Sequence, residues 1–417
     1  MTVWQTLRAP ALAQAPVLPR ALDNLLAGLL AALGFVLPLS VAGVSLALAA
    51  LAMLALAAAP SVWRCAPWRD PVAAVGLALL AYIAVHTLMF SGLTAVSLRT
   101  VNRYHELLML PILLALFRMV SRKHAFLLGL GCGAVGYAAA HWVAMFIPAL
   151  AAYLDPRRIS AGFGLALCAF VLLEQSRHLP RPWIGWAASA FLAVTVLFAV
   201  EGRTGHVVIV VLVACAAWIH SPRRWRWAAA IALPLVVLIL AWSSPAVQKR
   251  MGETLAGSSV QETGQLASTG IRRELLRNGL DLAQIYFWTG AGYANYSAVH
   301  DQATQARYAA DPLRSHYLQS HWVRTSNPHN EYLMQVVGGG IAALALFLAW
   351  VGLPMLRRTP GNNTGAVLAS LSLAFAVGCL FNSLLMDFVE GHVYGVLLAW
   401  LLALSIQPSA ETAGQRA

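Results

Sequence analysis

The chain of 417 residues is far more apolar than a soluble protein of its length, with 59% hydrophobic residues and only 11% charged ones. Soluble globular domains carry about 25% charged residues. This composition, with a mean hydropathy of +0.69, therefore excludes an ordinary soluble fold. Basic residues outnumber acidic ones by 28 to 16, and 26 of the 28 are arginine.

Apolar runs close to twenty residues long recur along the whole chain, and each can cross the ~30 Å hydrocarbon core of a bilayer as a helix. Because these Leu- and Ala-rich runs do not alternate with period two, they predict helices rather than the strands of a membrane barrel. The predicted fold is an all-α polytopic membrane protein with about twelve transmembrane helices. The fourth span is short, and the fifth is long enough to tilt or to continue beyond the membrane. In chain order the predicted spans are 21–39, 40–59, 71–90, 105–119, 124–153, 160–176, 183–201, 205–220, 226–243, 331–355, 364–386 and 390–407.

The spans divide the chain into three parts. Residues 1–243 hold the first nine predicted helices, and residues 244–328 form one long loop domain outside the membrane. Residues 329–417 hold the last three helices and a short tail.

The orientation follows from Lys and Arg in the short loops, because cytoplasmic loops are enriched in them. With a cytoplasmic N-terminus, 15 basic residues fall on the inside and five in short outer loops. Both termini are therefore predicted to be cytoplasmic, and the long loop domain periplasmic. The five exceptions are Arg99, Arg103, Arg157, Arg158 and Arg203.

These outer arginines need an explanation other than topology. Contact with lipid headgroups, or a local ion pair such as Asp155 with Arg157, would account for any one of them. Together with eight basic residues of the long loop domain, they place thirteen cations on one face. Arginine binds phosphate through its planar, multidentate guanidinium, so the pattern predicts a phosphorylated partner. A nucleic acid is excluded, because this face looks away from the cytoplasm.

Residues 271–285 predict an amphipathic helix in the long loop domain. Ile271, Leu275 and Leu282 recur at helical spacing, with Arg272 and Arg277 mostly on the other side. Such a helix lies against the membrane surface or the outer ends of a helix bundle. A turn at Gly290 and Gly292 follows it. A nucleotide-binding loop is excluded, because no strand precedes this turn and no GxGxxG pattern is present.

The long loop domain ends at His329, where a further helix is expected. Asn327 is a good N-cap and Pro328 a good first helical residue. These residues put His329 in the first turn, where the helix dipole favours the neutral imidazole. A neutral imidazole accepts a proton, and the free backbone N–H groups beside it bind anions. The alternative is an ordinary polar residue at the membrane interface. The remaining outer histidines, His300, His316 and His321, are expected to be solvated.

Several short motifs resemble those of the bacterial O-antigen ligases and their relatives. His329-Asn330, followed by nine residues and Gly340, resembles the family's signature, although Ala343 stands where Gly, Thr or Val is usual. Gly338–Gly340 would serve close packing, or would leave room for a lipid tail. Three further matches are the turn around Arg203, the stretch that starts at Arg158, and the helix that runs from Arg272 into the glycine turn.

The resemblance implies a GT-C-like membrane glycosyltransferase of lipopolysaccharide biosynthesis in the Gram-negative inner membrane. It would transfer O-antigen glycan from undecaprenyl diphosphate to lipid A–core at the periplasmic face, with inversion and without a metal or other cofactor. His329 would act as general base or would hydrogen-bond the phosphate, and Arg203 and Arg272 would hold the diphosphate. Arg157 and Arg158 would assist them in binding the diphosphate. Further supporting roles are implied for Asn330, Arg277, Tyr332, Arg99 and Arg103.

Two relatives and one unrelated class remain as alternatives. An O-antigen polymerase and a protein O-oligosaccharyltransferase share the signature. The second often has an extra C-terminal domain, and the His-Asn motif favours the ligase over the polymerase. A transporter or flippase would require internal repeats and ionisable residues at mid-membrane depth. The sequence shows no evident repeat, and its acids near the spans lie at their ends.

Overall fold

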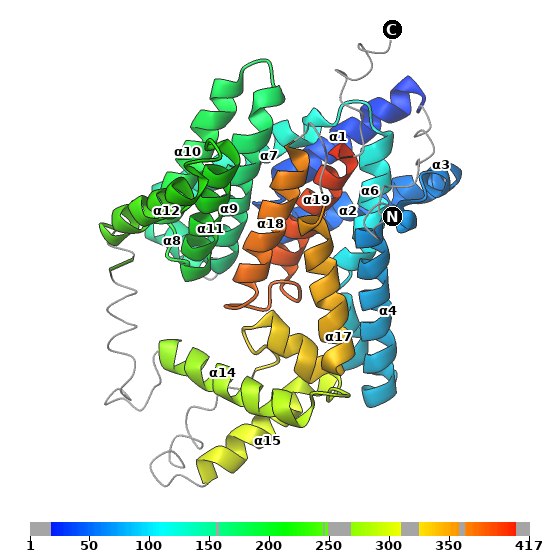
Figure 1. The fold of residues 1–417 in the computed structure, drawn as a ribbon. Coiled ribbons are helices and arrows are strands. Elements are labelled where there is room, and N and C mark those ends of the chain that lie inside the picture. The colour runs from blue at the N-terminus through cyan, green and yellow to red at the C-terminus, as the bar shows by residue number, and fades with distance from the viewer. Residues whose placement is uncertain are drawn as a thin grey trace.

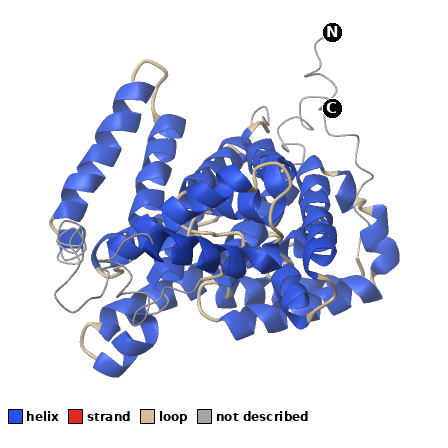
Figure 2. Ribbon diagram, turned by 90° about the horizontal axis from the view of Figure 1, so that it is seen from below, coloured by secondary structure: helices blue, strands red, loops and turns tan. Residues whose placement is uncertain are grey.

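The computed structural model describes residues 18–155, 158–244, 247–248, 268–309, 325–357 and 363–405. All regular secondary structure in these ranges is helical, and none of it is strand (Figure 2). The predicted all-α fold class is therefore confirmed.

Each of the twelve predicted spans corresponds to a helix. Figure 1 shows most of these helices packed as one bundle, with α14 (Ser268–Ile285) and α15 (Tyr296–Ala309) across one end of it. The bundle helices are α1 (Arg20–Val36), α2 (Val41–Ala57), α4 (Pro71–Ser91), α6 (Glu106–Met119), α7 (His124–Ala144), α9 (Arg158–Gln175), α10 (Pro182–Phe198), α11 (Arg203–His220), α12 (Arg226–Trp242), α17 (Glu331–Met355), α18 (Thr364–Gly378) and α19 (Phe388–Leu404). Shorter helices connect them: α3 (Ala59–Arg64), α5 (Ala95–Asn102) and α8 (Pro148–Leu154).

Within the described ranges, five helices are long and apolar enough to cross a membrane unaided, and the bent pair of α2 and α3 would make a sixth. The five are α4, α7, α9 with the turn that follows it, α11 and α17. Helices α10, α12, α18 and α19 are apolar but shorter. These findings fit a helical membrane protein, whereas twelve crossings and their orientation remain predictions.

Two predicted spans end earlier than expected. The span 124–153 breaks after Ala144, and Pro148 opens α8, because proline lacks the N–H group that would continue a helix. The span 364–386 ends at Gly378, and the chain then turns through residues 379–387 before α19 begins. This second turn carries side chains of the candidate site.

Glycines allow the closest helix contacts in the bundle. A Cβ atom on Gly133 of α7 would lie 2.0 Å from the carbonyl oxygen of Phe35 in α1. A Cβ atom on Gly205 of α11 would lie 2.5 Å from the Cα of Gly162 in α9. Small residues at such crossings let helix backbones pack tightly where burial of apolar surface gives no driving force between helices.

Helix α14 is amphipathic, as predicted. Leu275 and Leu282 are buried, whereas Arg273 and Arg277 are exposed. The helix packs on the start of α17, where a Cβ atom on Gly279 would meet the Leu333 side chain at 2.8 Å. Of the two predicted locations, contact with the end of the bundle is therefore the one described.

The glycine turn after α14 interlocks with a break in α17. Gly340 has a φ of +71° inside α17, and Gly290 has a φ of +72° in the turn. The backbone N–H of Ala291 donates to the carbonyl oxygen of Val337 at 2.7 Å, and that of Ile341 donates to Phe287 at 2.8 Å. The close packing expected of Gly338–Gly340 is present, but its partner is this loop rather than another helix.

Candidate active site

Helix α17 begins after His329, not before it. Asn330 is the N-cap, because its side chain accepts a hydrogen bond from the backbone N–H of Leu333 at 3.0 Å. The Asn327 side chain instead accepts from the backbone N–H of His329 at 2.7 Å and closes a tight turn. The prediction that Asn327 caps the helix and that His329 lies in its first turn is therefore wrong. Both asparagine side chains accept a backbone hydrogen bond, but Asn327 closes the turn before the helix and Asn330 caps the helix itself.

The backbone of His329 is strained. Its φ is +51°, a left-handed conformation that costs an L-residue free energy and persists only where surrounding contacts enforce it. Here those contacts are the Asn327 turn on one side and the Asn330 cap on the other. Residues in such conformations cluster at active sites, where the position of the side chain is needed for function despite the free-energy cost of the backbone conformation.

The imidazole of His329 is held by a short chain of side chains. Its Nδ1 lies 2.7 Å from the Oδ1 of Asn382, and the Nδ2 of Asn382 donates to the Oδ2 of Asp387 at 3.1 Å. Since Nδ2 must face the carboxylate, Oδ1 is an acceptor and the Nδ1 of His329 carries the proton. The Nε2 of a neutral His329 is then a proton acceptor.

Burial keeps this imidazole neutral. Burial is the largest cause that lowers the pKa of His329, and the positive charge of Arg272 lowers it further, whereas the hydrogen bond to Asn382 opposes both. The neutral form predicted from the sequence is thus supported, but by burial and Arg272, because His329 lies outside the helix. Burial also raises the pKa of Asp387 to about 6, against the opposing charge of Arg103.

Two of the predicted arginines lie at this histidine. Arg272, half-buried on α14, is close enough to affect the charge of the imidazole. Arg103, at the C-cap of α5, donates to the Oγ of Ser326 at 3.3 Å and lies near Asp387. The turn that carries His329 therefore has two cations close to it.

Arg158 and Arg203 lie side by side at the starts of α9 and α11. A Cβ atom on Gly202, the residue before Arg203, would lie 2.5 Å from the carbonyl oxygen of Arg158. The Arg158 side chain donates to the Asp155 carboxylate at 2.6 Å. The two arginines therefore form a second pair of cations at the ends of neighbouring helices.

The end of α18 connects this pair with His329. A Cβ atom on Gly378 would lie 3.6 Å from both Phe163 in α9 and Val208 in α11. The next residue, Cys379, accepts a hydrogen bond from the backbone N–H of Glu331 at 2.9 Å. The arginine pair and His329 thus lie at the same end of the bundle, on two sides of α18.

The remaining predicted site residues have other surroundings. Arg277 is exposed on α14 and Arg99 is exposed on α5. Asn330 caps α17, and the hydroxyl of Tyr332 donates to the carbonyl oxygen of Ala376 at 2.8 Å, tying α17 to α18. Arg157 lies outside the described residues, as do His316 and His321. His300 is buried against Asn278, so the expectation that it is solvated is wrong.

Sequence reasoning missed Asn382 and Asp387. Hydropathy places both at the end of a predicted span or in the gap after it, because the stretch 379–386 is largely apolar. The chain nevertheless turns there, since the Glu331 carboxylate accepts hydrogen bonds from the backbone N–H groups of Leu385 and Met386. Two consecutive polar residues inside the predicted span, Asn382 and Ser383, were the signal in the sequence that could have indicated this turn.

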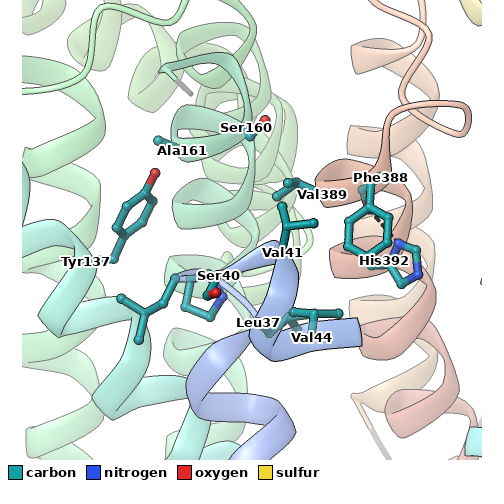
Figure 3. Close-up of a pocket in the computed structure, with 12 residues that line it drawn as sticks. Leu37, Ser40, Val41, Val44, Tyr137, Ser160, Ala161, Phe388, Val389 and His392 are labelled. Atoms are coloured by element: carbon teal, nitrogen blue, oxygen red, sulfur yellow. Dashed lines mark hydrogen bonds between the residues drawn. The ribbon is translucent and has the colours of Figure 1, made fainter. Parts of the chain in front are cut away.

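An apolar pocket opens beside this end of the bundle (Figure 3). It lies between the α1–α2 turn, α7, α9 and α19, and Ser160 and His392 give it polar edges. Ser160 is two residues from Arg158 and donates to the Glu390 carboxylate at 2.9 Å. The pocket therefore places apolar surface next to one of the arginines. Its lining residues are Leu37, Pro38, Leu39, Ser40, Val41, Val44, Tyr137, Ser160, Ala161, Phe388, Val389 and His392.

A sequence model of the family described as O-antigen ligase matches residues 188–348. The match includes Arg203, Arg272 and His329, the three residues to which the sequence analysis gave the main roles. Residues 188–348, fewer than half of the residues of the chain, are therefore similar to the O-antigen ligase family. None of the curated proteins compared with the chain matches it.

This similarity, together with the apolar helices, indicates a multi-pass membrane protein, and the matched family is one of glycosyltransferase-like enzymes that act on glycan and lipid substrates. Asn382 and Asp387, which orient His329, lie beyond the matched region. The site therefore combines residues of the family domain with a turn that the match does not reach.

Proposed function

We propose that the protein is an O-antigen ligase that transfers glycan from undecaprenyl diphosphate to lipid A–core at the periplasmic face of the inner membrane. The observation that carries the proposal is the half-buried His329, whose Nδ1 is hydrogen-bonded to Asn382 so that Nε2 is left to accept a proton, and whose pKa is lowered by burial. The cations near it, Arg272 and Arg103, suit a donor with a diphosphate leaving group.

In the proposed reaction His329 is the general base. The hydroxyl proton of the acceptor sugar passes to Nε2 while its oxygen forms a bond to the anomeric carbon of the donor. The bond from that carbon to the diphosphate breaks, and its electron pair leaves with undecaprenyl diphosphate, so that the configuration inverts. Asp387 stabilises the resulting imidazolium through Asn382. A well-placed general base contributes about 10²–10⁴-fold to the rate.

The tautomer favours the base over a phosphate ligand. A neutral imidazole that is protonated at Nδ1 has no proton on Nε2 to donate to a phosphate oxygen. Phosphate binding is instead the proposed role of Arg272, Arg203 and Arg158, with charge on the leaving group stabilised by about 3 kcal/mol for each donor. No metal takes part in this proposed step.

The apolar pocket beside Arg158 supports a lipid-linked donor. Its lining would hold part of a polyprenyl chain, while Arg158 and Arg203 at the helix starts would hold the diphosphate. A donor bound in this way has its reacting carbon at the end of the bundle that carries His329.

Deletion of the gene in its native host tests the proposal. We expect polymerised glycan to accumulate on its lipid carrier, and lipopolysaccharide to lose all O-antigen. Complementation with the wild-type gene should restore the full ladder. A deletion strain that adds single repeat units to lipid A–core would instead identify a polymerase, which is the second function that the family allows.

A further inference from the structure

A second group of titratable side chains lies where the starts of α6 and α19 meet. His105 is the N-cap of α6, Glu106 is its first residue, and His392 lies one turn into α19. One ligand atom from each lies within 4.8 Å of the others. All three residues are outside the region that matches the O-antigen ligase family. His105 and Glu106 have no role in the proposed transfer, and His392 enters it only as part of the lining of the apolar pocket.

The two imidazoles are oriented so that their Nε2 atoms face each other. The Nδ1 of His105 lies 2.6 Å from the carbonyl oxygen of Asn102, and the Nδ1 of His392 lies 2.5 Å from that of Phe388. A carbonyl oxygen only accepts hydrogen bonds, so both Nδ1 atoms carry protons. The two Nε2 atoms, 3.0 Å apart, then present lone pairs to each other. Such an arrangement requires a positive centre between or beside them.

Glu106 supplies a carboxylate next to this pair. Its side chain is 3% exposed, and within the described residues neither carboxylate oxygen has a hydrogen-bond partner. Gly391 of α19 leaves the space that it occupies, because a Cβ atom there would lie 3.3 Å from a carboxylate oxygen. A buried carboxylate without partners is costly unless it takes up a proton or a cation compensates its charge.

We propose that the Nε2 atoms of His105 and His392 and the carboxylate of Glu106 bind a divalent transition-metal ion, Zn²⁺ being the best match. Zinc takes two histidines and a glutamate with a fourth position for water, and ligand atoms about 2.1 Å from a tetrahedral ion are about 3.4 Å apart. Imidazole ligands typically donate their other N–H to a carbonyl, as both do here. The ion ties α6 to α19, and glycan transfer is not routed through it.

Metal binding to the purified full-length protein tests the site. After chelator treatment and desalting, titration with Zn²⁺ should give one tightly bound ion per chain and raise Tm. Glu106→Gln, which keeps the side-chain shape, and His392→Ala should each weaken binding by more than the roughly 10–100-fold seen when a ligand loses its hydrogen-bond partner. His178→Ala, which removes an exposed histidine, is the matched control and should bind as wild type does.

Cobalt gives a readout that does not depend on the variants. Co²⁺ bound to the wild-type chain should show the intense visible absorption of a tetrahedral site, and Zn²⁺ should displace it. A wild-type chain without stoichiometric Zn²⁺ or this absorption would overturn the proposal, as would a Glu106→Gln protein with undiminished affinity. The imidazole pair then shares a proton instead.

Discussion

Two histidine groups at the same end of the bundle differ in what holds their Nδ1 atoms. The Nδ1 of His329 donates to an amide that is itself bound to the Asp387 carboxylate, whereas His105 and His392 donate to backbone carbonyl oxygens. A carboxylate at the end of such a chain stabilises a ring that becomes charged. A carbonyl only fixes the tautomer of a ring that stays neutral. The first arrangement suits a base and the second a metal ligand.

The strongest test of this comparison asks whether one variant loses transfer activity alone and another loses Zn²⁺ binding alone. His329→Ala should lower transfer by about 10²–10⁴-fold, the contribution of a general base, while leaving Zn²⁺ binding intact. His105→Ala should lose Zn²⁺ binding and keep most of the transfer activity, because His105 does not line the apolar pocket. Measurements of glycan transfer and metal content on the same membrane preparations check both. Equal loss of transfer in the two variants would show that the groups are one site.

The cation beside His329 gives the next largest effect. Arg272→Ala should reduce transfer by about 100-fold, because a donor to the leaving group contributes about 3 kcal/mol. Arg273→Ala is the matched control, since Arg273 is exposed on the same helix and should stay near wild-type activity. Similar losses in both variants would point to general attraction of the anionic donor rather than to a specific contact.

The contact between the loop 287–291 and the break at Gly340 should contribute to the free energy of unfolding. Because His329 lies just before the same helix, loss of this contact should affect His329 more than the histidine pair of the proposed zinc site. Gly340→Ala puts a Cβ atom 2.5 Å from the carbonyl oxygen of Trp288 at a positive φ, and should cost about 1–3 kcal/mol. Gly352→Ala, in the same helix with no atom within 4 Å, should be neutral or slightly stabilising. Thermal unfolding in detergent compares them. A Gly340→Ala protein as stable as Gly352→Ala would contradict the interlock.

The smallest effect is expected from Asp387, the last side chain in the hydrogen-bonded series that starts at His329. In Asp387→Asn the contact of Asn382 with the imidazole is retained, so the tautomer stays and transfer should fall only about tenfold, the equivalent of ~1.4 kcal/mol. A general base must be neutral, so activity should fall as pH drops through the pKa of His329, which burial holds below its ordinary ~6.5. In the wild type the Asp387 carboxyl also takes up a proton near its pKa of about 6, whereas the variant has no such group, so its fall should follow the imidazole alone and lie at lower pH. A pH profile identical to wild type would contradict the proposed relay.

Hydropathy predicted the helices of the bundle because a membrane span needs a long apolar run. The ends of two spans were predicted less well, at Ala144 and Gly378, where local proline chemistry and tertiary hydrogen bonds decide. The turn 379–387 is apolar enough to look helical, and it is held open by the buried carboxylate of Glu331. No local pattern in the sequence reports such a contact.

The same limit applies to the site. The arginines and His329 could be found from charge, sidedness and a short motif, and the structure brings Arg272 and Arg103 to the histidine. The orientation of the imidazole could not be predicted from the sequence, because it depends on Asn382 and Asp387, which lie more than fifty residues further along the chain. The metal pair was missed for the same reason, since His105 and His392 come from opposite ends of the sequence.

The hydrogen bonds between the loop 287–291 and the break in α17 also bear on how such enzymes can be rebuilt. The obvious route to altered glycan preference would be to graft the outer helices of one ligase onto the bundle of another. Because the loop donates to and accepts from the backbone on both sides of Gly340, a graft that stops before α17 would leave those groups without partners inside the protein. If residues 268–341 are exchanged as a single block, the loop and the break in α17 come from the same protein and their backbone groups keep their hydrogen-bond partners.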